Sequence, residues 1–213
     1  MTLALYGYAR SSAAFRLRIG LNLKGLGHDT VVIDLRSGAQ KAPDYLALNP
    51  QGLVPLLRDG DEVLSQSLAI LEYLEEIQPE PPFLPSAPVD RARVRALALA
   101  VACEIHPLNN LRVLNYLTGD LGQDEDTKLA WYRHWIAEGL GSLEALTRQT
   151  SGKFSHGDTP GLADICLVPQ IFNARRFDCP LDDYPVLMRV FENCMALEAF
   201  DRAQPAKQPD FAG

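Results

Sequence analysis

The chain has 213 residues, of which 47% are hydrophobic and 22% are charged, and its formal net charge is -7. This length and composition are typical of a globular protein with one large domain or two domains of ordinary size. The acidic balance argues against a nucleic-acid-binding protein, because such proteins usually carry a basic stripe that contacts phosphates.

The first segment predicts a β-α-β unit. Residues 3–8 and 30–35 are apolar runs with the composition of strands. Between them, apolar residues recur at helical spacing, at Phe15, Ile19, Leu23 and Leu26. We expect Gly25 and Gly27 to end this helix.

Residues 49–65 predict a β-hairpin. An apolar run ends at Leu57, the pair Asp59-Gly60 favours a turn, and a second short run passes through Val63 and Leu64. A helix then opens at Gln66-Ser67, with Ile70, Leu71, Leu74 and Ile77 on its apolar face. The first eighty residues therefore predict the order β-α-β-(α)-β-β-α.

Five prolines between Pro79 and Pro88 mark a domain boundary, because prolines neither continue a helix nor pair within a sheet. Beyond them, two apolar stripes follow helical spacing: Val94, Leu97, Ala98, Val101 and Ile105, and Leu129, Tyr132, Ile136, Leu140 and Leu143. We predict an α/β domain over 1–80, a linker over 81–88 and an all-helical domain over 89–213. A polar, mobile tail is expected from Gln204 onward.

Pro107 interrupts a long helical pattern, where a proline costs about 3 kcal/mol. Two interpretations stay open. The kink is a packing bend, or it turns polar side chains toward a cleft, namely His106, Asn109, Asn110 and Arg112.

Two hydroxyls follow the first strand, in the run Arg10-Ser11-Ser12. At the start of a helix, unpaired N–H groups and the helix dipole favour a negative charge, such as a thiolate. A serine N-cap is common, however, and by itself this run favours the simpler interpretation that Ser11 or Ser12 only caps the helix.

The four cysteines lie far apart, with no C-x-x-C pair and no cluster of histidines, so the sequence predicts neither a metal site nor a dithiol site. We expect them to be buried and reduced. The chain begins without the pattern of a signal peptide and contains no apolar run of membrane-spanning length, which favours a cytoplasmic protein and no membrane partner.

The predicted order, a thioredoxin-like domain with a mixed sheet and then a helical bundle, resembles the cytosolic glutathione transferases. Residues 10–18 read R-S-S-A-A-F-R-L-R and resemble the zeta-class signature R-S-S-C-x-W-R-V-R. Residues 104–112, E-I-H-P-L-N-N-L-R, resemble the second-domain motif of that class. Ala13 replaces the signature cysteine and Phe15 its tryptophan. The missing cysteine argues against a function that relies on a protein thiol near the site, such as direct thiol–disulfide exchange.

Other positions carry weaker parts of the resemblance. Val54-Pro55 matches the cis-proline turn, whose preceding residue pairs with glutathione through its backbone, and Gln66-Ser67 matches the helix start that holds the γ-glutamyl end. From the residues alone, a trans proline and a simple Ser67 N-cap are the commoner outcomes. Gly161 stands where the family has a serine or threonine as the N-cap of a helix. Glycine is an acceptable N-cap, so we expect this helix to form, with Asp164 in its first turn.

The resemblance implies a homodimeric, glutathione-dependent isomerase that converts a small anionic cis enedioyl acid, maleylacetoacetate or maleylpyruvate, to its trans form in aromatic-compound breakdown. In this chemistry the thiolate of glutathione adds to the double bond, the resulting single bond rotates, and elimination restores the thiolate.

The resemblance also assigns roles to residues. Ser11, with Ser12, favours the thiolate; His106 and Arg112 stabilise the developing negative charge; and Arg10, then Arg176, pairs with the substrate's carboxylates. The predicted glutathione-binding set is Ser11, Ser12, Val54, Gln66, Ser67, His106, Asn110 and Arg112. The alternatives to these roles are that His106 only supports the fold and that Arg175 and Arg176 lie on a solvated helix face. Arg16 and Arg18 are expected to serve the fold or a dimer surface.

Two other functions stay open at this stage. One is a transferase or dehalogenase of the same class, which would consume glutathione. The other is a non-catalytic binding or scaffold protein on the same fold, against which the polar set Arg10, Ser11, His106 and Arg112 argues. The sequence does not choose between maleylacetoacetate and maleylpyruvate.

Overall fold

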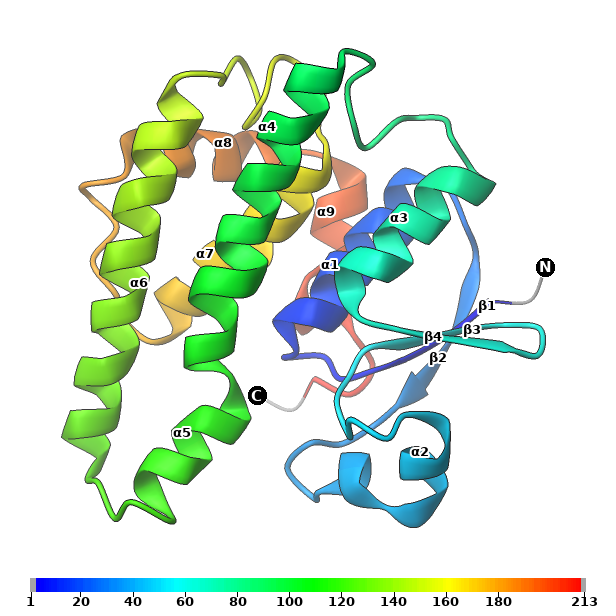
Figure 1. The fold of residues 1–213 in the computed structure, drawn as a ribbon, viewed down its shortest axis with the longest axis vertical. Coiled ribbons are helices and arrows are strands. Elements are labelled where there is room, and N and C mark those ends of the chain that lie inside the picture. Colours follow the sequence, from blue (N-terminus) through cyan, green and yellow to red (C-terminus); the bar gives the residue numbers. More distant parts are fainter. Residues whose placement is uncertain (1–2, 212–213) are drawn as a thin grey trace. The chain divides into compact units, whose positions relative to one another are not determined.

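The computed structural model describes residues 3–211 and divides the chain into two compact units (Figure 1). The first unit holds residues 3–82 and 196–211, and the second is Phe83–Met195. The border between Pro82 and Phe83 falls inside the segment predicted as a proline-rich linker. In the described part of the chain, no helix is both long and apolar enough to cross a membrane.

The first unit contains a mixed sheet of four strands. They are β1 (Leu3–Gly7), β2 (His28–Val32), β3 (Leu56–Asp59) and β4 (Glu62–Ser65), in the order β2-β1-β3-β4. Strand β1 pairs parallel with β2 and antiparallel with β3. Strands β3 and β4 form the predicted hairpin.

Strand β2 begins and ends earlier than the predicted range 30–35. Its register is set by β1, since Leu3 pairs with His28 and Gly7 pairs with Val32. Because β1 ends at Gly7, the ladder also ends there, although residues 33–35 have the composition of a strand. A pairing partner that is distant in the sequence thus fixes the strand's bounds.

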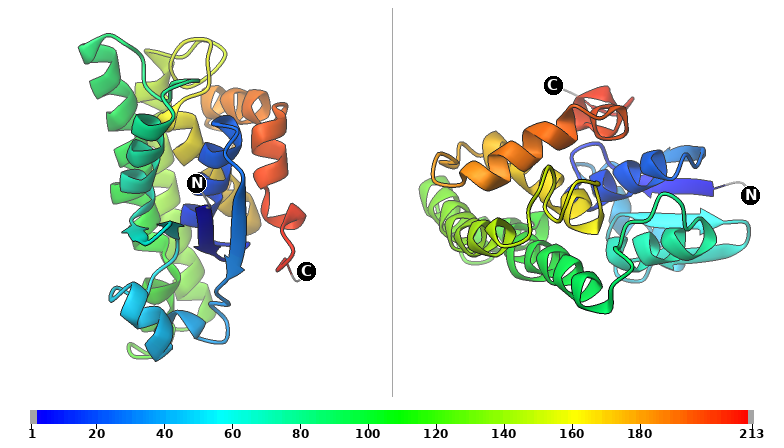
Figure 2. Two further views of the ribbon diagram at one scale, coloured as in Figure 1. Left: turned by 90° about the vertical axis from the view of Figure 1, so that its right-hand side faces the viewer. Right: turned by 90° about the horizontal axis from the view of Figure 1, so that it is seen from above.

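The α-helices of the first unit are α1 (Ser12–Leu23), α2 (Pro43–Leu48), α3 (Ser67–Ile77) and α9 (Glu198–Ala203). Helix α1 packs against both α3 and α9, and Figure 2 shows α9 beside α1. Phe15 and Ile19 of α1 are at most 1% exposed. Helix α1 ends before Leu26, as expected from Gly25, which has a φ of 65°.

The second unit contains α4 (Pro88–Leu99), α5 (Leu111–Thr118), α6 (Glu125–Arg148), α7 (Leu162–Arg176) and α8 (Pro185–Met195). Both predicted stripes face its core. Every residue of the first stripe is at most 5% exposed, and all of the second stripe except the half-buried Leu129 is at most 2% exposed. Helix α4 packs on α7, and α6 packs on α8.

The long helix breaks at the place that Pro107 predicts. Helix α4 continues into a π-helical segment, Ala100–Ile105, and a 3₁₀ turn, His106–Asn109. Helix α5 then starts afresh, with Asn110 as its N-cap. Pro107 lacks an N–H group and its ring crowds the preceding turn, so an α-helical ladder does not pass through it.

Helix α7 begins normally with Gly161 at its N-cap, as predicted. Asp164 accepts hydrogen bonds from the N–H groups of Gly161 and Ser155, both at 2.9 Å. A Cβ atom at Gly161 would lie 2.6 Å from the carbonyl oxygen of Phe83. The close approach of that carbonyl therefore explains why a glycine stands at this N-cap.

The cysteines follow the prediction with one exception. Cys166, Cys179 and Cys194 are buried, but Cys103 is exposed. Cys103 lies between the buried residues Val101 and Ile105 of the π-helical segment and points away from their face.

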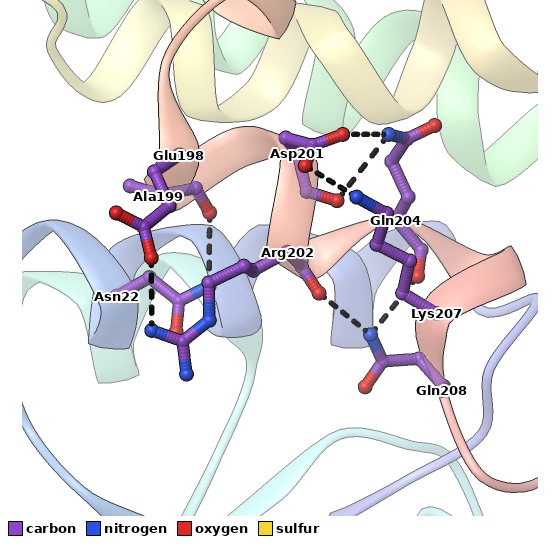
Figure 3. A network of polar contacts seen from close by, with 8 residues as sticks. All are labelled: Asn22, Glu198, Ala199, Asp201, Arg202, Gln204, Lys207 and Gln208. Carbon is purple, nitrogen blue, oxygen red and sulfur yellow. Dashed lines mark hydrogen bonds and ion pairs between the residues drawn. The ribbon is translucent and has the colours of Figure 1, made fainter.

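The C-terminal segment differs from the prediction. The helical domain was expected to run to residue 213, but residues 196–211 belong to the first unit. Asn22 of α1 donates a hydrogen bond to the carbonyl of Ala199 at 2.9 Å. Figure 3 shows how the polar network continues through Asp201, Gln204 and Gln208. The segment predicted to be a mobile tail thus takes part in hydrogen bonds with the rest of the first unit, including one from the N–H of Ala9 to Asp210. Residues 212–213 lie outside the described part.

Candidate active site

Ser11 lies between β1 and α1 and is the N-cap of α1. Its Oγ accepts a hydrogen bond from the N–H of Ala14 at 3.2 Å. This bond is the capping interaction that the simpler interpretation of the sequence expected. A hydroxyl has two lone pairs and one hydrogen, however, so an oxygen that caps a helix still has its hydrogen to donate. Capping and donation to a thiolate are therefore compatible at Ser11.

The neighbours of Ser11 differ in exposure. Ser12 is the first residue of α1 and is buried, with 5% exposure. Arg10 is half-buried, and its guanidinium carbon lies 5.1 Å from the centre of the Phe211 ring. The structure thus places a cationic side chain directly before the N-terminus of α1.

A second helix N-terminus belongs to α3. Gln66 precedes it with φ 69° and ψ 113°, a conformation that residues other than glycine rarely adopt. Ser67 is buried, and its Oγ accepts a hydrogen bond from the Arg16 guanidinium at 3.3 Å. Arg16 therefore joins α1 to the start of α3, in agreement with its expected role in the fold.

The loop before β3 supplies Val54. The Val54-Pro55 peptide bond is cis, as the resemblance implied. The carbonyl of Leu53 accepts hydrogen bonds from the Tyr45 hydroxyl at 2.6 Å and from the Asn49 amide at 2.8 Å. The backbone next to Val54 is therefore held firmly by α2 and its C-cap.

Three polar residues beside this loop were missed by the sequence analysis: Gln40, Lys41 and Gln51. Gln51 accepts a hydrogen bond from the exposed amide of Gln66 at 2.8 Å. Gly52 has a φ of 59°, and a Cβ there would lie 2.8 Å from Nζ of Lys41. Among the described residues, the buried Oε1 of Gln40 has no hydrogen-bond partner. The only signal in the sequence is the position of Gln51 between Asn49-Pro50 and Val54. Gln40 and Lys41 lie in a single 3₁₀ turn, Ala39–Lys41, which is too short to show a periodicity.

The second unit brings His106, Asn110 and Arg112 together. The Asn110 side chain accepts a hydrogen bond from the N–H of Arg112 at 3.2 Å, and its Nδ2 lies 3.4 Å from Nε2 of His106. An amide that donates to Nε2 requires a neutral ring with its proton on Nδ1. The side chain of Arg112 is exposed.

The indole of Trp131 fixes the same turn, since its N–H donates to the carbonyl of Leu108 at 2.8 Å. The break at Pro107 places His106 in the 3₁₀ turn, Asn110 at the N-cap of α5 and Arg112 in its first turn.

Arg176 lies elsewhere in the second unit, at the C-terminus of α7. It is exposed, and its guanidinium carbon lies 5.1 Å from the centre of the Phe177 ring. Arg175 lies over Phe191 in the same manner, at 4.4 Å. Within this unit Arg176 is not part of the His106 turn, and its role in binding a carboxylate remains a prediction.

Comparisons with known proteins match both units. A family model described as "Glutathione S-transferase, N-terminal domain" matches residues 10–77, and one described as "Glutathione S-transferase, C-terminal domain" matches 136–198. The chain is 47% identical to a probable maleylacetoacetate isomerase of Vibrio cholerae serotype O1 over 212 residues, 99% of each chain.

Two solved structures are similar to this chain over nearly its whole length. A maleylpyruvate isomerase described as a bacterial zeta-class glutathione transferase is 47% identical with a TM-score of 0.96, covering 98% of this chain and 100% of that one. The chain belongs to the zeta class of glutathione S-transferases. A maleylacetoacetate isomerase of Methylobacterium extorquens AM1, solved with malonate and glutathione, is 43% identical with a TM-score of 0.96, covering 99% and 100%.

The first unit of this zeta-class transferase has groups that fit glutathione, a peptide with two carboxylates. The N-termini of α1 and α3 present the positive ends of their helix dipoles, which favour anions. Lys41 adds a cation, and the unpartnered Oε1 of Gln40 offers a buried acceptor. The first unit contains no cysteine.

Proposed function

We propose that this zeta-class transferase is a glutathione-dependent cis-trans isomerase of maleylacetoacetate or maleylpyruvate. The observation that carries the proposal is the position of Arg10 and Ser11 directly before α1, where the Ser11 hydroxyl lies at the positive end of the helix dipole. The names of the full-length relatives support the same reaction.

Bound glutathione supplies a thiolate that adds reversibly to the substrate's double bond and so permits rotation. Ser11 donates its hydroxyl hydrogen to that sulfur, and the dipole of α1 favours the negative charge. Both effects lower the pKa of a thiol below its ordinary value near 8.5. Ser12, Val54, Gln66 and Ser67 hold the rest of the peptide.

The substrate carries its own negative charges. Arg10 binds a carboxylate through the paired donors of its guanidinium, and Arg176 is the second candidate for this role. Arg112 and His106 stabilise the charge that develops on the substrate's oxygen, with Asn110 orienting the histidine ring. The protein acts as a cytoplasmic homodimer.

The test is an ultraviolet assay of the purified protein with each acid, with and without an amount of glutathione far below that of the substrate, while the remaining thiol is titrated. We expect isomerisation that requires glutathione and leaves its concentration constant over many turnovers. Stoichiometric loss of thiol would instead indicate a transferase or dehalogenase, and failure to bind glutathione would indicate a scaffold protein. Relative rates rank the two acids.

A further inference from the structure

Residues 196–211, called the tail from here on, contact the turn that carries Arg10 and Ser11. The N–H of Ala9 donates a hydrogen bond to Oδ2 of Asp210 at 2.7 Å, across 201 residues of sequence. The next residue of the segment, Phe211, presents its ring to the Arg10 guanidinium at 5.1 Å. Two consecutive residues of the tail thus meet two consecutive residues of the turn.

Arg18 joins the same turn to α9. This side chain is only 5% exposed; its Nε donates to the carbonyl of Ala203 at 2.8 Å, and its Nη2 donates to the carbonyl of Ala9 at 2.9 Å. Burial lowers the pKa of Arg18 to about 10, while the Asp210 carboxylate acts in the opposite direction. The guanidinium is therefore charged at neutral pH and attracts Asp210.

Both polar backbone groups of Ala9 are held in this way, the N–H by Asp210 and the carbonyl by Arg18. Ala9 is 1% exposed, so water does not replace a bond that is lost there. Asp210 therefore fixes the peptide plane between Tyr8 and Ala9, and Arg18, which is itself bonded to the carbonyl of Ala203, fixes the plane between Ala9 and Arg10. The Phe211 ring restricts where the Arg10 side chain lies.

We propose that Asp210 and Phe211 are positioning residues that hold Arg10 in place for a carboxylate of the substrate. The proposal rests on the function proposed above for Arg10. It gives the tail a role in recognising the acid, in addition to its packing on α1 through α9.

A tail that only stabilises the fold would behave differently. Its loss would lower the melting temperature and weaken the binding of glutathione and of the acid to the same extent. A tail that positions Arg10 affects the anionic acid through Arg10 alone, so its effect disappears when Arg10 is already absent.

The experiment compares Phe211→Ala with Phe211→Tyr, which keeps an aromatic ring. Gln208→Ala is the matched control, because the Gln208 side chain donates to the carbonyls of Arg202 and Gln204 in the same segment (Figure 3). Calorimetry in the presence of glutathione measures the Kd of malonate, and the Kd of glutathione is measured separately. Each Phe211 variant is also made in the Arg10→Ala background.

We expect Phe211→Ala to raise the Kd of malonate about tenfold and to change that of glutathione less than twofold. Phe211→Tyr and Gln208→Ala should stay within about twofold of the wild type for both ligands, and Phe211→Ala should add nothing to Arg10→Ala. An equal loss in both backgrounds, a parallel loss of glutathione affinity, or a wild type that binds no malonate would overturn the proposal.

Asp210→Ala is tested by amide hydrogen exchange, which is independent of turnover. We expect faster exchange at residues 9–11, whereas exchange as slow as in the wild type would overturn the role of Asp210. If neither acid is isomerised, the proposed function fails, and the malonate and exchange measurements still decide the positioning role.

Discussion

At the scale of single residues, Ser11 combines two tasks that substitution can separate. Ser11→Ala removes the cap and the donor, and we expect a loss of about 1 kcal/mol in the free energy of unfolding together with a fall in kcat of at least tenfold. Ser11→Asp keeps a capping oxygen but has no hydroxyl, so it should retain stability and lose activity. Urea denaturation and steady-state kinetics check both, and an active Ser11→Asp would rule out the donor role.

Arg10 gives a prediction about ligands. Arg10→Ala should weaken binding of the anionic acid by about 10- to 100-fold, the effect of losing charged hydrogen bonds worth about 1.5–3 kcal/mol. The affinity for glutathione should change far less. Arg10→Lys keeps the charge without the paired donors, and we expect an intermediate effect. Equal losses of both ligands would contradict the proposed carboxylate role.

His28 predicts how stability depends on pH. Burial at the start of β2 lowers its pKa, and the carbonyl of Leu26 acts in the opposite direction. Below a pH of about 6.5 the unfolded chain takes up a proton that the folded chain resists, so the free energy of unfolding falls as the pH falls through this window. The slope is at most about 1.4 kcal/mol per pH unit. In urea denaturation, the free energy of unfolding of His28→Gln should depend less on pH than that of the wild type. An equal pH dependence of the two proteins would contradict the role of His28.

Some residues of the candidate site could be predicted from the sequence and others could not. The motifs predicted Arg10, Ser11, Val54 and Gln66 because each stands in a recognisable pattern. Gln40 and Lys41 lie in a 3₁₀ turn that packs closely against Gly52. These positions are far enough apart in the sequence that no periodic pattern predicts the contact. The bonds of Ala9 with Asp210 and Arg18 are hidden for the same reason.

At the scale of elements, α6 contains two glycines with opposite expected effects. A Cβ at Gly139 would lie 2.5 Å from Cδ1 of Ile105, the buried residue before His106, whereas a Cβ at Gly141 would have nothing within 4 Å. Gly139→Ala should therefore lower the free energy of unfolding by about 1–3 kcal/mol. Gly141→Ala should raise it by about 0.5–1 kcal/mol, because alanine favours a helix. Thermal denaturation checks the pair, and a stabilised Gly139→Ala would contradict the close packing.

Element types were more predictable than element bounds. Apolar stripes predicted the buried faces of α4 and α6, and Pro107 predicted the break between α4 and α5, since both are local properties of the chain. The bounds of β2 follow from the length of β1 and thus from pairing. The local pattern of residues 30–35 does not contain that information.

At the scale of the whole molecule, the sequence predicted an α/β unit and a helical unit, with the border in the proline-rich segment. The predicted zeta-class family is confirmed by relatives that match over nearly the full length. The return of residues 196–211 to the first unit was missed. That segment is polar and short, and its helix α9 is recognised only through what it packs against, namely α1.

The most direct test of the account is a pH titration of the ultraviolet thiolate absorbance of glutathione bound to the wild type and to Ser11→Ala. The account predicts that bound glutathione is a thiolate at neutral pH, with a pKa below the ordinary value near 8.5, and that Ser11→Ala returns this pKa toward that value. A bound thiol that titrates like free glutathione, or a lowered pKa that survives in Ser11→Ala, would contradict the role assigned to the Ser11 hydroxyl.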